Sequence, residues 1–424
     1  MPRLGGSWTI GPANPRPPSE PSVLRVNRNP VLEADVLILG GGIAGLWLLQ
    51  RLLHAGYAAV LVEQDRLGGG QTGAAQGIIH GGVKYALDGQ PTDASEAIAD
   101  MPRRWRACLE GQGEVDLRRV QVLADGFHLW SVERPGGALG QLLGSPALRD
   151  RVTPLRCEDQ PPCFRHEAFQ GSVYRLDEFV LDPASLVATL AAPHAPHIIR
   201  VSNVAGGLRH DGGDFRLPTG GPTLQARQII LAAGAGNAEL LAALGRTEPD
   251  MQRRPLQQVA VELRHPHAVN GHCVTASSIH GPVLTVTSHP LGQDHWLLYL
   301  GGQLAEAGSV RSSGVQIEAA QALVAEVLPW LLPHLTAWRS LRIDRAEAAA
   351  ADASRPAKAF VHAEAGVITV WPTKLALVPD LADQVLPLLS PPQDPDRRRS
   401  DTLAAQLSDL PRPQTTRGLA EYLQ

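Results

Sequence analysis

Residues 34–64, ADVLILGGGIAGLWLLQRLLHAGYAAVLVEQ, predict a strand, a helix and a second strand packed as one unit. The segment 36–39 is a short apolar run, which is typical of a strand buried in a parallel sheet. A helix is predicted next, because apolar residues recur at helical spacing from Ile43 to Leu53 and Gly56 follows them, as is common where a helix ends. Residues 57–62 predict the second strand, and Glu63 stands at its end. We therefore expect an α/β protein.

Three glycines where the first strand leads into the helix, Gly40, Gly42 and Gly45, form the pattern G-x-G-x-x-G. The first permits a tight turn, the second lets a pyrophosphate approach the backbone, and the third lets helix and strand pack closely. The free N–H groups at the start of the helix attract phosphate. Glu63 can accept hydrogen bonds from a ribose hydroxyl, and its charge would repel the 2′-phosphate of NADP. The pattern predicts a dinucleotide site, FAD or NAD, with a glycine-rich turn in an ordinary α/β domain as the alternative.

The segment that follows, DRLGGGQTGAAQGIIHGGVKYAL at 65–87, favours FAD. An NAD-binding domain usually continues with alternating strands and helices, whereas this segment is rich in small residues. Small residues let a backbone lie against a large flat ligand. Thr72 can donate a hydrogen bond to phosphate, and residues 77–82 carry His80 along the same ligand.

The stretch GIIHGGVKY at 77–85 resembles the FAD-dependent oxidoreductases of the D-amino-acid oxidase superfamily. Two branches are similar there: FAD-dependent glycerol-3-phosphate dehydrogenase, with H-G-G-[hydrophobic]-R-Y, and L-2-hydroxyglutarate dehydrogenase, with G-[hydrophobic]-I-H-[small]-G. Three later segments also resemble the superfamily, namely YRLDEFVLDPASLVATLAA at 174–192, RQIILAAGAGNAELLAALG at 227–245 and GVITVWPTKLALVPDLADQV at 366–385. In the superfamily the last of these closes over the isoalloxazine ring.

The resemblance implies a mixed α/β fold, in which a Rossmann-like FAD-binding domain carries an inserted antiparallel-sheet substrate domain. The alternating segments QQVAVELRH, PVLTVTSHP and HWLLYLGG are consistent with that sheet. We expect a disordered N-terminal arm, three parts of an FAD-binding domain, two parts of a substrate domain and a polar C-terminal tail. The FAD-binding parts are 31–110, 171–250 and 340–395, and the substrate parts are 111–170 and 251–339. The arm comprises residues 1–30 and the tail residues 396–424.

The glycine pattern and the resemblance together imply a set of residues in contact with FAD. They are Gly40, Gly42, Ile43, Ala44, Gly45, Glu63, Gln64, Thr72, Gly77, Val204, Ala233, Gly234, Thr373 and Lys374. The later run 234–239 lacks the third glycine of a second G-x-G-x-x-G, so no separate NAD(P)H site is expected and the electrons should come from an organic substrate.

Four residues are candidates for the chemistry, because flavin performs the redox step and the protein must bind and orient the substrate. His80 could act as a base on a substrate hydroxyl, pack against the flavin, or be structural. Lys84 and Tyr85 could hold an anionic group, or could be a solvated lysine and a core tyrosine. Arg345, in LRIDRAE, could bind a carboxylate or phosphate, and Arg342 competes for that role.

Other positions limit what the resemblance implies. Lys374 could stabilise negative charge on reduced flavin, although the usual glycine-rich loop is replaced here by residues 371–374. The glycerol-phosphate branch has arginine where this chain has Lys84. Lysine keeps the positive charge but cannot make the paired hydrogen bonds of a guanidinium group. Substrate identity therefore does not carry over. The remaining histidines of the predicted strands and loops are interpreted as structural or surface residues: His272, His280, His289 and His295.

Three functions remain open at this point. The first is an FAD-dependent dehydrogenase or oxidase of a small anionic hydroxy compound, such as a 2-hydroxy acid or polyol phosphate. The second is an amine or amino-acid oxidase of the same superfamily, and the third is a non-catalytic flavoprotein subunit. The electron acceptor could be oxygen, a quinone or another protein.

Composition excludes some partners of this 424-residue chain. Its net charge is −4 without a polybasic patch, and the short run Arg397 to Arg399 lies beside acidic residues, so nucleic acid is not an expected partner. The four cysteines form no C-x-x-C pair, which favours reduced thiols in the cytoplasm over disulfides or zinc. No apolar run reaches the length of a membrane span, although peripheral contact with the inner face of the membrane is compatible with the sequence.

Overall fold

The computed structural model describes residues 29–83, 97–133, 152–275, 278, 281–350, 356–394 and 398–419. Lys84, Tyr85 and nearly all of the predicted N-terminal arm lie outside these ranges, so their roles stay predictions.

The first sheet is mostly parallel and contains the predicted strand–helix–strand unit. Its order is β10-β2-β1-β13-β12-β11, with β20 also paired to β13 and β19 paired to β20. The parallel strands are β1 (Val31–Leu39), β2 (Ala59–Glu63), β10 (Ile198–Arg200), β13 (Thr223–Leu231) and β20 (Val367–Trp371). The antiparallel additions are β11 (Arg209–Asp211), β12 (Asp214–Pro218) and β19 (Phe360–Glu364). β1 is buried continuously from Ala34 to Leu39, as expected for a strand covered on both faces.

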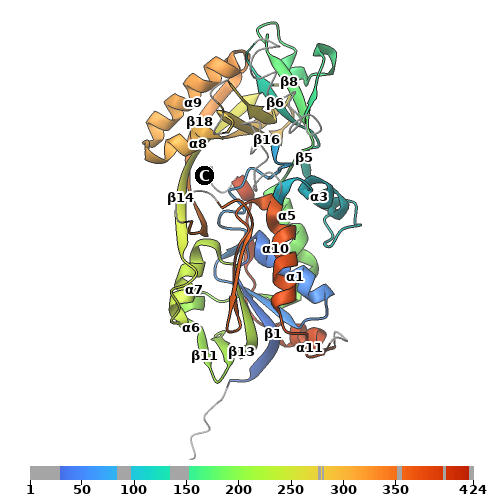
Figure 1. Ribbon diagram of the computed structural model, residues 1–424, viewed down its shortest axis with the longest axis vertical. Helices are drawn as coiled ribbons and strands as arrows, with labels where there is room; N and C mark the ends of the chain where they lie inside the picture. Colours follow the sequence, from blue (N-terminus) through green and yellow to red (C-terminus); the bar gives the residue numbers. More distant parts are fainter. Residues whose placement is uncertain are drawn as a thin grey trace, which may run out of the picture.

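Helices cover both faces of this sheet (Figure 1). On one face Ile38 packs in a core with α1 (Ile43–His54), α5 (Pro183–Ala191) and α10 (Val378–Val385). On the other face Leu39 packs in a core with α6 (Val204–Gly207), α7 (Asn237–Ala243) and α11 (Arg398–Gln406). The prediction of an α/β, Rossmann-like unit is confirmed.

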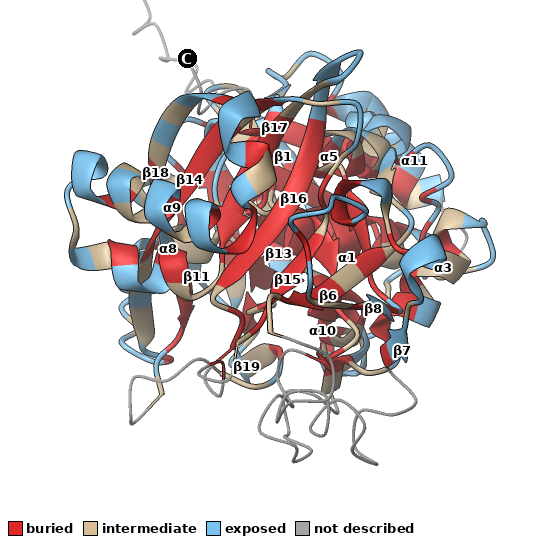
Figure 2. Cartoon of the chain, turned by 90° about the horizontal axis from the view of Figure 1, so that it is seen from above, coloured by how far each residue is buried: buried red, intermediate tan, exposed pale blue. Residues whose placement is uncertain are grey.

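The second sheet is almost wholly antiparallel and forms the other half of the molecule (Figure 1). Its order is β18-β14-β17-β16-β15-β6-β8-β7, and only the β15–β6 pair is parallel. The strands are β6 (Phe127–Ser131), β7 (Val152–Pro154), β8 (Ser172–Leu176), β14 (Met251–Arg264), β15 (Gly271–Cys273), β16 (Leu284–Gly292), β17 (His295–Gly301) and β18 (Leu335–Ala348). α8 (Gln303–Ala307) and α9 (Ser313–Val327) pack on it, and Figure 2 shows the buried strands of this sheet beneath the half-exposed α9.

A small third sheet lies between the two halves and positions His80. It consists of β4 (Ile78–Ile79), β9 (Phe179–Leu181) and β5 (Val122–Ala124), with β9 in the middle. Asp125 and Gly126 separate β5 from β6, so the chain passes there from the small sheet into the second sheet. α3 (Met101–Leu109) packs beside β4.

The described part of the polar C-terminal segment packs against the rest of the molecule. Leu403 of α11 and Leu407, which directly follows the helix, are buried against the first sheet. β21 (Gln414–Thr415) then pairs with β3 (Arg66–Leu67), and Leu419 packs against the second sheet. The domain boundaries given above stay a prediction.

Within the described ranges, no helix combines the length and the apolar character that crossing a membrane requires.

Candidate active site

Two joined cavities lie where the sheets meet. The first, which we call the glycine cavity, has a volume of about 370 Å³ and is bordered by residues 40–44 and the ends of β1, β2 and β13. The second, the His80 cavity, has a volume of about 320 Å³ and lies between β4, β14, β18 and the loop after β20. Both are lined by Ile43, Gln71, Thr72 and Pro372. Because the two cavities share these lining residues they adjoin, which suits an elongated ligand with one end at the glycines and the other near His80.

The three glycines of the first motif differ in how closely neighbouring backbone atoms approach them. Gly40 has a φ of +116°, and a Cβ there would lie 2.6 Å from the carbonyl carbon of Ala232. A Cβ on Gly45 would lie 2.0 Å from the carbonyl oxygen of Gly40. Gly42 is extended, and a Cβ there would meet only the Thr72 hydroxyl, at 3.3 Å. Gly40 and Gly45 thus maintain the fold, whereas Gly42 keeps space open at the start of α1.

Polar groups around the glycine cavity are already oriented by the backbone. The Glu63 carboxylate accepts hydrogen bonds from the N–H groups of Gly41 at 2.6 Å and of Gln64 and Asp65 at 2.9 Å. Thr72 Oγ1 accepts from the N–H of Ile43, the first residue of α1, at 3.1 Å. The predicted contacts Ala44, Gln64, Val204, Ala233 and Gly234 also line this cavity.

Gly77 and the loop after β20 border the His80 cavity. Gly77 has a φ of +74°, and a Cβ there would lie 1.9 Å from the carbonyl oxygen of Leu181. Thr373 has a φ of +61°, a conformation that favours glycine, and its hydroxyl donates to the carbonyl of Lys358 at 3.1 Å. The Lys374 Nζ atom donates to the carbonyl of Ala357 at 2.8 Å. Both side chains are thus anchored to the segment 357–358 beside the cavity, where the resemblance predicts the flavin.

His80 is held by a buried carboxylate that the sequence analysis did not single out. Its Nδ1 atom lies 3.0 Å from Glu178 Oε2, and the other oxygen of Glu178 accepts from the N–H of Gly81 at 3.0 Å. Burial raises the pKa of Glu178, but the neighbouring His80 and His272 outweigh it and hold this pKa well below its usual range. Glu178 is therefore an ionised carboxylate against His80, and only its position just before a buried strand could have indicated it.

His272 is wholly buried, and it belongs to the same cluster. Its Nε2 atom lies 3.7 Å from Glu178 Oε2, and its Nδ1 atom lies 2.8 Å from the hydroxyl of Thr285. Thr285 in turn lines the His80 cavity. The chain brings His80, Glu178 and His272 together from three distant segments, which explains why spacing along the sequence did not reveal them.

Arg345 and Arg342 occupy opposite faces of β18. Arg345 lines the His80 cavity together with Ile343, whereas Arg342 is exposed and is not among the lining residues. Arg345 lies 3.7 Å from Glu306, which also lines the cavity. The cavity that His80 lines therefore also contains a guanidinium beside a carboxylate.

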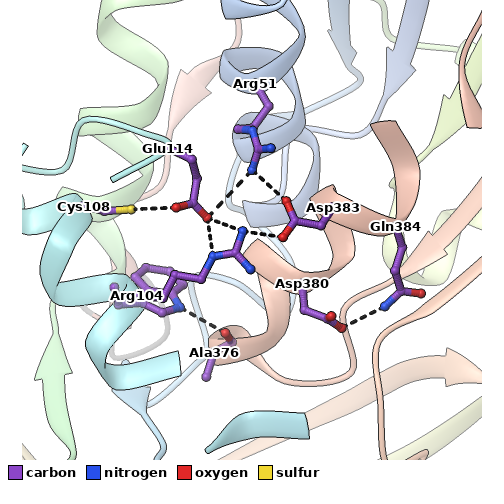
Figure 3. A network of polar contacts seen from close by, with 9 residues as sticks. Arg51, Arg104, Cys108, Glu114, Ala376, Asp380, Asp383 and Gln384 are labelled. Carbon is purple, nitrogen blue, oxygen red and sulfur yellow. Dashed lines mark hydrogen bonds and ion pairs between the residues drawn. The ribbon is translucent and has the colours of Figure 1, made fainter. Parts of the chain in front are cut away.

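A network of polar contacts links α3 to α10 (Figure 3). Arg104 bonds to Glu114 and Asp383 at 2.7 Å each, and Arg51 of α1 contacts the same two acids. The Trp105 indole donates to the carbonyl of Ala376 at 3.0 Å, in the turn that follows Lys374. These contacts fix the backbone just beyond the loop 372–374.

Comparison with known proteins now identifies the family. Residues 35–370 match the model of the DAO family, described as FAD dependent oxidoreductase. The chain belongs to this family. The chain is similar to a Pseudomonas aeruginosa protein named "Probable FAD-dependent oxidoreductase PA4991". The two are 46% identical over 385 residues, which cover 90% of this chain and 96% of that protein. The crystal structure of PA4991 has a TM-score of 0.75 and covers 92% of this chain and 98% of that one.

Other relatives are more distant. Glycerol-3-phosphate dehydrogenase 1 of Mycobacterium tuberculosis is 26% identical over 241 residues, 52% of this chain and 44% of that protein. Glycine oxidase from Geobacillus kaustophilus is 18% identical with a TM-score of 0.62, over 84% of this chain and 95% of that one, and this likeness shows the fold alone. The DAO-family protein described here is an FAD-dependent oxidoreductase.

The donors and spaces of the two cavities fit FAD. The open approach at Gly42 and the first N–H groups of α1 suit a pyrophosphate, and the Glu63 carboxylate at the same cavity is an acceptor that suits a ribose hydroxyl. The His80 cavity then has room for the ring system, between the segment 74–78 and the loop 372–374.

Proposed function

We propose that this DAO-family enzyme oxidises a small anionic hydroxy compound, such as a 2-hydroxy acid or a polyol phosphate. The observation that carries this proposal is the His80–Glu178 pair at the edge of the cavity. A hydroxyl group must lose its proton when it becomes a carbonyl, so its oxidation needs a base. Oxidation of an amine needs only the neutral amine.

The pair supplies that base in the arrangement of a histidine oriented by a carboxylate. Glu178 holds Nδ1, so Nε2 is the nitrogen that takes the hydroxyl proton. The buried carboxylate stabilises the imidazolium that forms. When bound, FAD supplies the acceptor for the hydride that leaves the same carbon, and the substrate becomes an aldehyde, ketone or oxo acid.

Arg345 would bind the anionic group of the substrate. Its guanidinium lines the cavity and carries a fixed positive charge, which suits a carboxylate or phosphate. Lys374, buried at the same cavity, would add positive potential near the ring of bound FAD. The final electron acceptor is oxygen, a quinone or another protein in this proposal.

A second candidate is oxidation of an amino acid. It is favoured by Glu306, whose carboxylate lies 3.7 Å from Arg345 at the same cavity. Such a pair could bind the carboxylate of an amino acid through Arg345 and its ammonium group through Glu306. Mutating Glu306 therefore separates the two candidates: Glu306→Gln would weaken reduction by an amino acid much more than reduction by a hydroxy acid.

The test compares matched pairs of 2-hydroxy and 2-amino acids, with polyol phosphates, for anaerobic bleaching of the flavin. Bleaching by a hydroxy compound supports the proposal, and bleaching only by amino acids contradicts it. Arg345→Gln should raise the substrate KM by about tenfold or more, which corresponds to a lost charged hydrogen bond. Arg342→Gln is the matched control, because Arg342 lies on the opposite, exposed face of β18, and it should leave KM unchanged.

A further inference from the structure

One carboxylate oxygen of Glu178 lies close to two histidine side chains. Oε2 lies 3.0 Å from His80 Nδ1 and 3.7 Å from His272 Nε2, while Oε1 accepts from the N–H of Gly81. Glu178 and His272 are both wholly buried. Any change of charge on one imidazole is therefore felt by the other through the shared oxygen, with little solvent to screen it.

The two imidazoles also lie close to each other. Their rings stack with centroids 5.6 Å apart and an angle of 18° between planes. Two positive charges at this separation in a buried site would repel each other strongly, whereas one positive charge balances the single carboxylate. The cluster therefore favours a single positive charge shared by the two imidazole rings.

Thr285 determines the orientation of His272. If its hydroxyl donates to Nδ1 across the 2.8 Å contact, then the proton of neutral His272 resides on Nε2 and faces Glu178. Phe127 packs edge-on against the ring at 4.8 Å and further restricts it. In this state His272 is uncharged and donates to the carboxylate, which leaves the imidazolium charge to His80.

We propose that His272 is a positioning residue that sets the basicity of His80 by sharing Glu178 with it. The consequence for catalysis rests on the proposed function, whereas the coupling between the histidines does not. Other charged groups at the cavity that His80 faces are Lys374 and Arg345, which lower its proton affinity, and Glu306, which raises it. None of these three is changed in the test.

The test follows the imidazole signals of the FAD-loaded enzyme by nitrogen NMR across a pH series. His80 is assigned by its loss in His80→Gln. In the wild type, His80 should titrate in two coupled steps, because the rings share one charge. In His272→Phe it should titrate in a single step whose midpoint lies about one pH unit higher, since His80 then no longer shares Glu178 with a second imidazole.

A second variant at the same position tests the coupling if His272→Phe does not fold. His272→Gln retains an amide that can donate to Glu178 but cannot carry a charge, so it should also give a single step with a smaller rise. His289→Gln is the matched control, because His289 is another buried histidine of the same sheet with its ring nitrogen 3.2 Å from Thr287, and it should leave His80 unchanged.

Two results would overturn the inference. One is a single-step titration of His80 that neither His272 variant shifts while FAD binding is intact. The other is a stoichiometric metal ion in the purified enzyme that is lost from both variants, because the same three side chains have ligand atoms within 4.8 Å of one another. Failure of the proposed function is a separate result: no hydroxy compound would bleach the flavin, yet the His80 titration would still shift.

The pH dependence of flavin reduction connects the coupling between the histidines with the proposed function. If the proposed function holds, the base-limited part of the rate profile should move to higher pH in His272→Phe by the same amount as the NMR midpoint. A histidine that only fills space would reduce stability without moving that profile.

Discussion

Replacing Gly42 with alanine separates cofactor binding from folding. Gly42 has a φ of −77° and a ψ of −177°, which alanine adopts without strain. Its added Cβ would contact only the Thr72 hydroxyl, at 3.3 Å, so the apoprotein should unfold within about 1 kcal/mol of the wild type. The same methyl group occupies the space where a pyrophosphate would approach the start of α1. An overpacking cost of about 2 kcal/mol in the complex corresponds to a roughly 30-fold higher Kd for FAD.

The assay titrates apoprotein with FAD by fluorescence quenching and measures urea unfolding of the same apoprotein. Gly70→Ala is the matched control, since Gly70 lines the same cavity and a Cβ there would meet nothing within 4 Å. Gly45→Ala should instead destabilise the apoprotein itself, because its Cβ would collide with the carbonyl of Gly40. An unchanged FAD affinity in Gly42→Ala would refute the assignment of this cavity to the pyrophosphate.

Three further variants test contacts that support the site. Trp105→Phe removes the donor to the Ala376 carbonyl and should lower the free energy of unfolding by about 1–2 kcal/mol in urea titrations. Asp182→Ala removes the cap that accepts from the N–H of Ser185 at the start of α5 and should cost about 1 kcal/mol by the same measurement. Burial lowers the pKa of His289 to about 4, so the unfolded chain binds a proton there first and stability falls as the pH drops from about 6.5 to 4. His289→Gln should remove this loss, which amounts to about 2 kcal/mol between pH 7 and pH 5, as measured by unfolding curves at these two pH values.

Local sequence patterns predicted the nucleotide-binding half well. The strand, glycine turn and helix of residues 34–54 follow from hydrophobic periodicity and backbone sterics, which act between neighbours in sequence. The helix start at Asp182 and Pro183 is likewise a local signal, and the structure has the cap there. Glu63 and Thr72 line the glycine cavity, and their contact with FAD stays a prediction.

The acid–base cluster could not be predicted in this way. His80, Glu178 and His272 are separated by about a hundred residues each and meet only because β4 pairs with β9 while β15 joins the second sheet. Sequence patterns do not report such long-range packing, so Glu178 was not singled out and His272 was interpreted as structural. The packing of residues 398–419 could not be predicted from their polar composition either, because two buried leucines, Leu403 and Leu407, are enough to attach this segment to the first sheet.

The most direct test of the account is the rate of anaerobic flavin reduction in His80→Gln, with the hydroxy compound that reduces the wild type best. If His80 is the base for hydroxyl oxidation, the rate constant should fall by about 100-fold or more while the Kd for FAD stays within a factor of two or so. A variant that binds FAD and is reduced at nearly the wild-type rate would contradict the proposed role of His80 and Glu178.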